Sequence, residues 1–250
     1  MRSNVPTVTV LGIRVVCLPR KQVLSVVGEL LDSPAPRLLA YANAHSLNVA
    51  VRNAAYRRVL DDAALVLNDG AGLAIAARLQ GKSFPDNLNG TDLTPEILRV
   101  AAERDAPVYF LGGEPGIAET AARNLTTRIP GLRVAGTRHG YFTPAEQSEV
   151  IEGIKASGAR ILVVAMGNPR QELWLDRHLA DTGARLGVAV GAFLDFAAGK
   201  VSRAPEWMRK AGIEWLYRLG LEPRRLFARY VLGNPLFLAR VLAERVFTKR

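Results

Sequence analysis

Short apolar runs alternate with amphipathic helical patterns at least five times along this chain, and this alternation limits its possible folds more than any other feature. The first two runs flank a turn at Gly12, but the segments between the later runs are too long for hairpin turns, so those strands are expected to run parallel. Helices bury both faces of such a sheet. The sequence therefore predicts an α/β fold with a doubly wound, mostly parallel, Rossmann-like sheet. Strands are expected at 5–11, 13–16, 37–42, 63–67, 107–111, 132–137, 160–165 and 184–190.

Helical patterns fill the intervals between these strands. A single helix is expected after the Asn43–His45 loop, ending near Arg58. The segment 90–105 is typical of a helix capped by Asp92 or Thr94 before Pro95. The remaining helices are expected at 19–31, 71–81, 117–128, 144–156 and 170–180.

The last fifth of the chain has a different pattern. Residues 200–250 contain no strand-like run and carry 12 Lys+Arg against 4 Asp+Glu, so they hold +8 of the total charge of +10. A nearly neutral body and a basic tail indicate separate roles. We predict an α/β catalytic domain at 1–199 and a helical, basic, membrane-associating appendage at 200–250. Its short helices are expected to break at Gly220, Pro223 and Gly233-Asn234-Pro235.

Composition limits where the protein works. Cys17 is the only cysteine, so no disulfide can form within the chain, which fits a reducing compartment. The N-terminal residues lack the apolar segment and cleavage site of a signal peptide. No uncharged apolar run reaches the roughly 18 residues that a spanning helix needs. We expect a cytosolic protein, or one attached to the cytosolic side of a membrane.

Polar residues follow two of the predicted strands. Asp69 comes after the strand 63–67 and opens a helix, while Asn43 and His45 follow the strand 37–42. Ligands of open α/β sheets bind at the carboxyl edge of the strands, so these residues are expected to share one crevice. Asp69 could act as a general base, a ribose anchor or a helix cap. Asn43 and His45 could equally be loop and capping residues.

Two further strand ends carry possible ligand contacts. Gly112 and Gly113 begin a glycine-rich turn that could bring backbone amides to a phosphate, although it is an incomplete dinucleotide motif and could be only a tight turn. In the segment 166–172, Asn168 is expected to be exposed and Gln171 could bond to a base or a sugar hydroxyl. Glu172 could simply complement the helix dipole. The sequence has no Asp-x-Asp and no cluster with metal-ligand spacing, so neither a metal nor another cofactor is expected.

Arginines and large apolar residues alternate in the tail. This mixture could form a nucleic-acid patch, an interfacial set of helices on anionic lipid, or an ordinary solvated face. Large apolar residues such as Trp207, Trp215 and Leu236–Leu238 favour a membrane surface over nucleic acid. We therefore expect an anionic membrane as a partner and no nucleic acid.

Together these motifs resemble the WecG/TagA/CpsF family of bacterial glycosyltransferases. The similar stretches occur in family order over nearly the whole chain. They are 42–50 (ANAHSLNVA), 67–73 (LNDGAGL), 88–98, 109–116 (YFLGGEPG), 140–142, 164–174 (VAMGNPRQELW), 190–219 and 222–230.

The resemblance implies an inverting, metal-independent transfer of a hexose from a UDP-sugar to a polyprenyl-diphosphate-linked saccharide. The hexose would be glucose, N-acetylmannosamine or its uronic acid, and the product an exopolysaccharide or another cell-surface polymer. The resemblance assigns Asp69 as general base, with His45 as second choice, and assigns substrate binding to Asn43, Gln171 and the arginines Arg203, Arg218, Arg225 and Arg229. The appendage would close over the site and bring the enzyme to the inner face of the membrane. Dimers occur in the family, so a homo-oligomer is possible.

One position departs from the family pattern, and two other functions stay open. Tyr41 stands where the family often has a threonine, so the sugar specificity is expected to differ. The glycine turn would also suit an NAD-dependent enzyme, although it does not follow the first strand. A non-catalytic membrane- or RNA-binding adaptor is the third possibility, in which the basic tail alone would account for binding.

Overall fold

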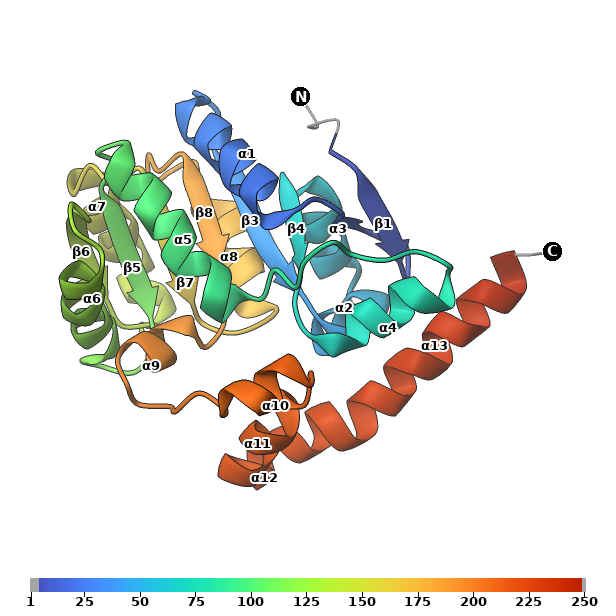
Figure 1. Cartoon of the computed structure of the whole chain (residues 1–250). Coiled ribbons are helices and arrows are strands. Elements are labelled where there is room, and N and C mark those ends of the chain that lie inside the picture. Colours follow the sequence, from blue (N-terminus) through green and yellow to red (C-terminus); the bar gives the residue numbers. More distant parts are fainter. Residues whose placement is uncertain (1–4, 249–250) are drawn as a thin grey trace.

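The computed structural model describes residues 5–248, with side chains through residue 245. Residues 1–4 of the first predicted domain and 249–250 of the second therefore lie outside the described residues. Six parallel strands form the central sheet in the order β4-β3-β8-β7-β5-β6 (Figure 1). The predicted doubly wound α/β fold is confirmed. The strands are β3 (Arg37–Ala42), β4 (Leu65–Asn68), β5 (Val108–Gly112), β6 (Val134–Arg138), β7 (Ile161–Ala165) and β8 (Leu186–Ala189). The first two strands, β1 (Thr7–Val10) and β2 (Ile13–Val16), form a separate antiparallel hairpin.

Alternate side chains of each strand enter two different cores. In β3, Leu38 and Ala40 pack on one side of the sheet, while Leu39 and Tyr41 pack on the other. The first core contains α2 (Ala44–Arg52), α3 (Ala54–Asp62), α4 (Ala71–Leu79), α7 (Gln147–Ala156) and α8 (Arg170–His178). The second core contains α1 (Arg20–Asp32), α5 (Gly90–Glu103), α6 (Ile117–Arg128) and α9 (Phe193–Ala197). Because both faces are covered, the strands other than the edge strand β6 are mostly buried and apolar, as parallel strands usually are.

Two helix boundaries differ from the sequence prediction. The single helix expected to end near Arg58 is two helices, because Asn53 has an extended backbone and its Oδ1 accepts a 3.0 Å hydrogen bond from Tyr56 N. Helix α5 is capped by Asn89, whose Oδ1 accepts a 3.0 Å bond from Asp92 N, and not by Asp92 or Thr94. In both places a local asparagine bond decides where the helix begins.

The C-terminal segment is more continuous than expected. It contains α10 (Glu206–Lys210), α11 (Glu214–Leu221), α12 (Pro223–Phe227), the π-helical turn η2 (Ala228–Leu232) and α13 (Gly233–Thr248). The predicted breaks at Gly220 and at 233–235 are wrong, whereas a break just before Pro223 is confirmed. Pro235 is tolerated because the π turn before it already interrupts the α-helical bonding pattern. We call residues 200–248 the appendage.

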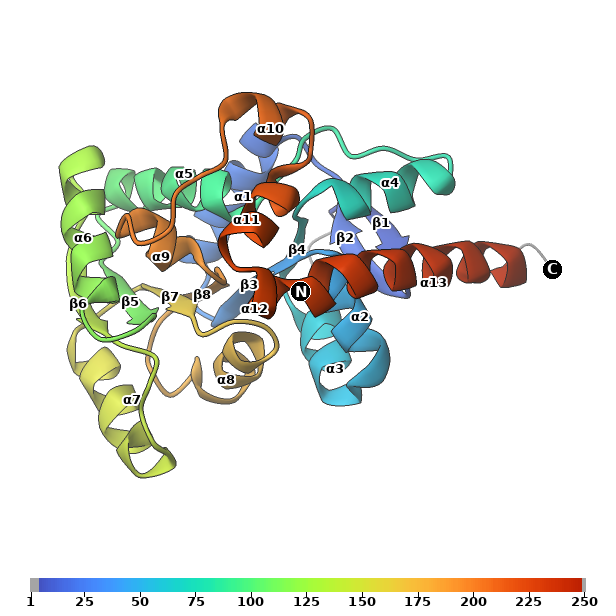
Figure 2. The same ribbon diagram turned by 90° about the horizontal axis from the view of Figure 1, so that it is seen from below.

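The appendage packs closely on the sheet domain. Helix α13 runs along α2 and α4, and its Phe237 and Val241 are 0% and 1% exposed (Figures 1 and 2). Arg240 donates to the backbone and side-chain oxygens of Asn48 at 3.3 and 2.6 Å. These contacts place α11 and α12 across the carboxyl ends of the strands (Figure 2).

One helix in the described part of the chain, Pro223–Arg245, is long and apolar enough to cross a membrane by length and composition alone, with a mean hydropathy of 1.3. A helix that packs into a soluble core passes the same test. Here Phe237 and Val241 are buried against the sheet domain, and Arg229 and Arg240 interrupt the apolar sequence.

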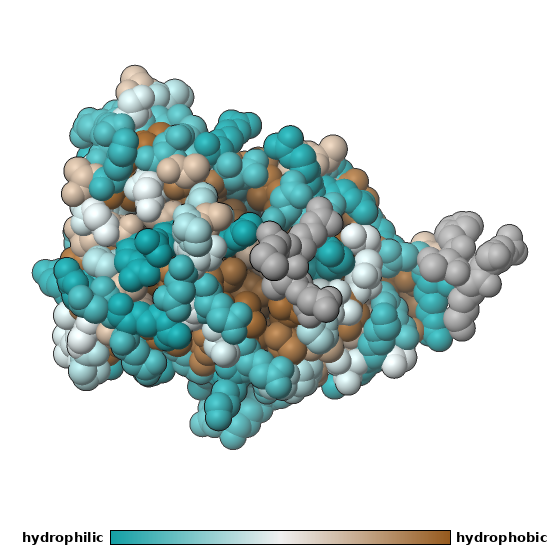
Figure 3. Space-filling view, turned by 90° about the horizontal axis from the view of Figure 1, so that it is seen from above, coloured by the Kyte–Doolittle hydropathy of each residue, from teal (hydrophilic) through white to brown (hydrophobic). Residues whose placement is uncertain are grey.

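On the opposite side, at the amino ends of the strands, the surface is largely hydrophilic around a central apolar area (Figure 3).

Candidate active site

A cavity of about 550 Å³ lies where the appendage covers the carboxyl edge of the sheet. The loops that follow β3, β4, β5, β6, β7 and β8 supply its walls, and Arg218, Arg225 and Arg229 of the appendage complete its lining. Helices α11 and α12, which carry two of these arginines, lie across the ends of the strands (Figure 2). The predicted crevice at this edge is therefore present. Of the predicted site residues, those that line it are Tyr41, Asn43, His45, Asp69, Gly113, Asn168, Gln171, Arg218, Arg225 and Arg229.

Asp69 and Asn43 lie side by side at the ends of neighbouring strands. Asn43 Nδ2 donates a 3.3 Å hydrogen bond to Asp69 Oδ2, while Asn43 Oδ1 accepts a 3.1 Å bond from Ser46 N. Asn43 is thus both the cap of α2 and the partner of Asp69. Asp69 itself does not cap α4, because the cap residue there is Gly70, with a positive φ of 86°. The Asp69 carboxylate therefore stays available to a ligand.

Opposing effects act on the pKa of Asp69. Burial raises this pKa, whereas the hydrogen bond from Asn43 and the guanidinium groups of Arg229 and Arg218 lower it. The net change is upward. A carboxylate with a raised pKa is a stronger base than an exposed one, which suits general base catalysis near neutral pH.

His45 lines the same cavity as Asp69. Burial, together with the charge of Arg229, lowers the pKa of His45 to about 4. The imidazole is neutral near pH 7 and is a weaker base than a free histidine. As a second-choice general base it remains a prediction.

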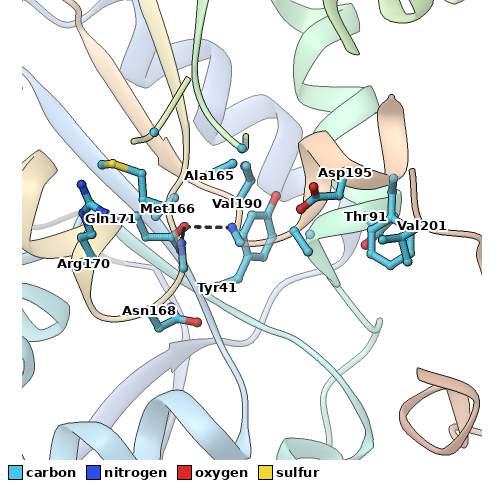
Figure 4. Close-up of a pocket in the computed structure, with 18 of the residues that line it drawn as sticks. Tyr41, Thr91, Ala165, Met166, Asn168, Arg170, Gln171, Val190, Asp195 and Val201 are labelled. Atoms are coloured by element: carbon cyan, nitrogen blue, oxygen red, sulfur yellow. Dashed lines mark hydrogen bonds between the residues drawn. The ribbon is translucent and has the colours of Figure 1, made fainter. Parts of the chain in front are cut away.

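Tyr41 contributes its ring to the cavity. Its hydroxyl lies 3.2 Å from Thr94 Oγ1 in α5, and both side chains are buried. The ring packs against Gly90, where an added Cβ would lie 3.2 Å from the ring carbon Cδ2. The hydroxyl is therefore engaged by α5, and the ring fills the space beside the cavity (Figure 4).

The side-chain amides of Asn168 and Gln171, which follow β7, both donate to the buried carboxyl of Glu172. Gln171 Oε1 accepts hydrogen bonds from Gly167 N at 3.1 Å and Gly191 N at 3.0 Å, and its Nε2 donates to Glu172 Oε1 at 2.9 Å. Asn168 Nδ2 donates to the same Glu172 oxygen and to the Tyr56 hydroxyl. Gln171 thus ties the β7–α8 loop to the β8–α9 loop, with both atoms of its amide already bonded.

Glu172 differs most from its sequence interpretation. The residue is 0% exposed, so it is not a surface charge that merely complements the helix dipole. Burial raises the pKa of its carboxyl to about 7, although hydrogen bonds from Gln171, from its own backbone N–H and from Asn168 oppose the rise.

The glycine turn after β5 has two separate roles. Gly113, with φ of 70°, lines the cavity. Gly112 is not among the lining residues, and a Cβ there would lie 2.3 Å from the carbonyl oxygen of Ala165 in β7. Gly112 therefore permits close approach of two strands, and contact with a ligand stays a prediction for it.

The four predicted arginines do not share one environment. Arg218 and Arg229 face the cavity, and the Nε atom of each is buried without a hydrogen-bond partner among the described residues. Arg225 lies at the rim, paired with Glu222 at 2.6 Å. Arg203 is outside the cavity lining and bridges Asp92 and Glu214 at 2.9 and 3.0 Å. Arg203 thus links the appendage to α5, and substrate contact by it stays a prediction.

Sequence reasoning missed five charged residues that line the cavity, namely Glu114, Arg170, Asp195, Lys200 and Glu222. Asp195 follows β8 and points into the cavity (Figure 4), and burial raises its pKa. Lys200 pairs with Glu114 at 2.9 Å, joining the start of the appendage to the β5–α6 loop. Asp195 lies in the first turn of α9, the helix that follows β8, so a search for carboxylates at the start of helices after strands could have identified it.

A second cavity, of about 340 Å³, adjoins the first and is also lined by Asp69. Both cavities are lined by Asn43, His45, Asp69, Arg218 and Arg229. The second cavity has more apolar walls, supplied by Ile75, Trp215, Tyr230, Phe237 and Leu238. The carboxylate therefore lies between a polar compartment and an amphipathic one.

The chemistry of this site centres on one carboxylate and several cations. Among residues 5–248, no group of three or more His, Cys, Asp or Glu side chains is placed to hold a metal ion. The arginines and glycine amides suit an anionic ligand.

A sequence model of the glycosyl transferase family WecG/TagA/CpsF matches residues 8–250, nearly the whole chain.

Proposed function

Because the chain belongs to the glycosyl transferase family WecG/TagA/CpsF, we propose that it transfers a hexose from a UDP-sugar to a polyprenyl-diphosphate-linked saccharide, inverting the anomeric carbon. The hexose would be glucose, N-acetylmannosamine or its uronic acid, and the product an exopolysaccharide or another cell-surface polymer. The observation that carries this proposal is the position of Asp69 between two cavities of different polarity.

The polar cavity suits the sugar nucleotide. Arg218 and Arg229 face Asp69 and would bind the diphosphate, and Gly113 offers a backbone approach to it. Negative charge grows on the departing UDP, and fixed cations in a partly buried site stabilise such charge without rearrangement. The arginines would in this way take the place of a divalent cation, making the transfer metal-independent.

The amphipathic cavity suits the acceptor. Its aromatic and aliphatic wall includes Trp215, Tyr230 and Phe237, and would receive the saccharide and the first carbons of a lipid chain. The acceptor hydroxyl would then reach the donor from the Asp69 side.

The chemistry follows from these placements. Asp69 accepts the proton of the acceptor hydroxyl as that oxygen attacks the anomeric carbon. The bond from the anomeric carbon to the diphosphate breaks on the opposite face, and UDP leaves with the electron pair. Asp69 ends protonated and returns its proton to water.

The appendage would bring this site to the membrane. Trp207, Phe227 and Leu232 are 64%, 53% and 62% exposed, and residues 200–250 carry a net charge of +8. Exposed aromatic and aliphatic side chains with basic residues are typical of interfacial helices on anionic lipid. We propose a peripheral location on the inner face of the cell membrane, with residues 1–199 as the catalytic domain.

Replacing Asp69 tests the proposed reaction. Asp69→Asn keeps the shape and the hydrogen bond to Asn43 but removes the base, so turnover with a UDP-sugar and a polyprenyl-diphosphate-sugar acceptor should fall about 100-fold or more. The UDP dissociation constant should stay within about twofold, since the diphosphate contacts remain. Asp32→Asn, the same change at a largely exposed aspartate in α1, is the matched control and should keep wild-type turnover. Wild-type turnover in a folded Asp69→Asn protein would refute the assignment.

A further inference from the structure

Glu172 is a buried carboxyl that the proposed chemistry does not use. It lies in the first turn of α8 with 0% exposure. Its Oε1 atom accepts hydrogen bonds from two side-chain amides, Gln171 and Asn168, and its Oε2 atom has no hydrogen-bond partner among the described residues. Burial of a carboxyl is costly unless hydrogen bonds replace those that it made to water. Both of its partners line the polar cavity.

The two amides are constrained in different ways. Two backbone N–H groups point at Gln171, and these can only donate, so they fix its oxygen toward them regardless of Glu172. Asn168 has no such pair. Its other partner is the Tyr56 hydroxyl, which can either donate or accept. Only the carboxyl oxygen of Glu172, therefore, determines which end of the Asn168 amide faces inward.

With the amide nitrogen of Asn168 turned to Glu172 and Tyr56, its Oδ1 atom is left without a partner among the described residues. Asn168 is half-buried in the cavity wall, where it projects from the β7–α8 loop (Figure 4). The cavity thus presents a hydrogen-bond acceptor at this point. If the amide were reversed, the same point would present a donor.

We propose that Glu172 is a positioning residue that orients the Asn168 amide, so that Asn168 Oδ1 accepts a hydrogen bond from an N–H or hydroxyl group of the bound sugar nucleotide. This inference rests on the proposed function for the identity of the ligand, but the orientation of the amide does not.

The first measurement follows the Asn168 side-chain amide directly. In ¹⁵N spectra of the full chain, the NH₂ protons of Asn168 should be protected from exchange in the wild type and in Glu172→Gln, which keeps an acceptor oxygen. Glu172→Met keeps the volume but removes the acceptor, and exchange should be faster by about tenfold or more. Equal protection in Glu172→Met and the wild type would overturn the orienting role.

The second measurement is affinity for UDP and for each UDP-sugar of a donor panel. Glu172→Met should weaken the tightest-bound of these about tenfold, and Glu172→Gln should restore affinity to within about threefold of wild type. In the Asn168→Ala background the Glu172→Met change should have little further effect, because the contact is already lost. Thr182→Val is the matched control: it removes another buried polar group, bonded to Leu179 O beyond the far end of α8, and should leave affinity unchanged.

The outcomes separate the two proposals. If the wild type binds neither UDP nor any UDP-sugar, the proposed function fails, and amide exchange alone decides the role of Glu172. If the wild type binds but Asn168→Ala keeps full affinity, the contact from Asn168 is refuted. Because Asn168→Ala alters only a half-buried side chain, it remains informative if Glu172→Met does not fold.

Discussion

Asn43 takes part in two interactions that the sequence presents as alternatives. Its oxygen caps α2 through Ser46 N, and its nitrogen donates to Asp69. The short side chain can do both because parallel strands β3 and β4 end next to each other, with Ala42 paired to Asn68. The helix cap therefore also fixes the Asn43 amide in the orientation that donates to the candidate base.

A pH profile tests the charge balance around Asp69. The positive charge of Arg229 lowers the pKa of Asp69, so Arg229→Gln should raise that pKa. A base with a higher pKa is protonated at higher pH, so activity on the acid side of the kcat profile should be lost at a higher pH than in wild type. Lys155→Gln, an exposed change in α7, is the control. An acid limb that stays in place or moves downward would contradict this arrangement.

At the scale of residues, the sequence predicted where the site residues lie better than which interactions they make. Asp69, Asn43 and His45 were found because polar groups that follow strands meet at one sheet edge. The role of Gln171 was not predictable, because its partners Gly167 and Gly191 follow different strands and only the fold brings them together. The burial of Glu172 was not predictable either, because it also depends on segments that only the fold brings together.

At the scale of elements, the appendage is fixed to the sheet domain both before and after the helices that cover the cavity. Arg203 links it to α5 through Asp92, and α13 docks through Phe237 in a groove made by α2 and α4. Between these anchors, α11, α12 and η2 bring Arg218 and Arg229 to the cavity. The arginines in this segment therefore divide into anchoring and cavity-facing groups.

Two arginine variants test that division. Arg203→Ala should lower the free energy of unfolding by about 1 kcal/mol, because its ion pairs are partly exposed, and should change UDP affinity little. Arg218→Ala should instead weaken UDP binding by about tenfold with little change in stability. Thermal melts and UDP titrations of both variants give the comparison. If Arg203→Ala weakens UDP binding as strongly as Arg218→Ala, the division is wrong.

Sequence patterns located every strand of the sheet but not every helix boundary. Apart from β6, the strands are mostly apolar on both faces, and such runs are easy to recognise when helices separate them. The errors at Asn53 and Pro235 have local causes. A capping asparagine divides one amphipathic pattern into two helices, and a π turn allows a proline to remain inside a helix. Neither leaves a periodic signal in the sequence.

At the scale of the whole molecule, the two sides differ in surface character. The side at the amino ends of the strands is largely hydrophilic around its central apolar area (Figure 3), while the appendage exposes large apolar side chains beside the cavities. A lipid-linked acceptor has to reach the amphipathic cavity from a membrane. The proposed orientation places the appendage on the lipid surface.

Vesicle binding tests this orientation. The double variant Trp207→Ser, Phe227→Ser should bind anionic vesicles about tenfold or more weakly, since each aromatic side chain buries a large apolar area in the interface. High salt should weaken wild-type binding without abolishing it, because apolar burial is not screened. Val51→Ser, an exposed change in α2, is the control. Equal binding by the double variant would place the membrane contact elsewhere.

The most direct test of the central claim is UDP release from a panel of UDP-sugars, with a polyprenyl-diphosphate-sugar acceptor and EDTA present. We predict release from one donor, dependent on the acceptor and on Asp69, and undiminished by EDTA. Release that disappears with EDTA would contradict the role given to Arg218 and Arg229. No release from any donor by folded, vesicle-bound protein would contradict the proposed reaction itself.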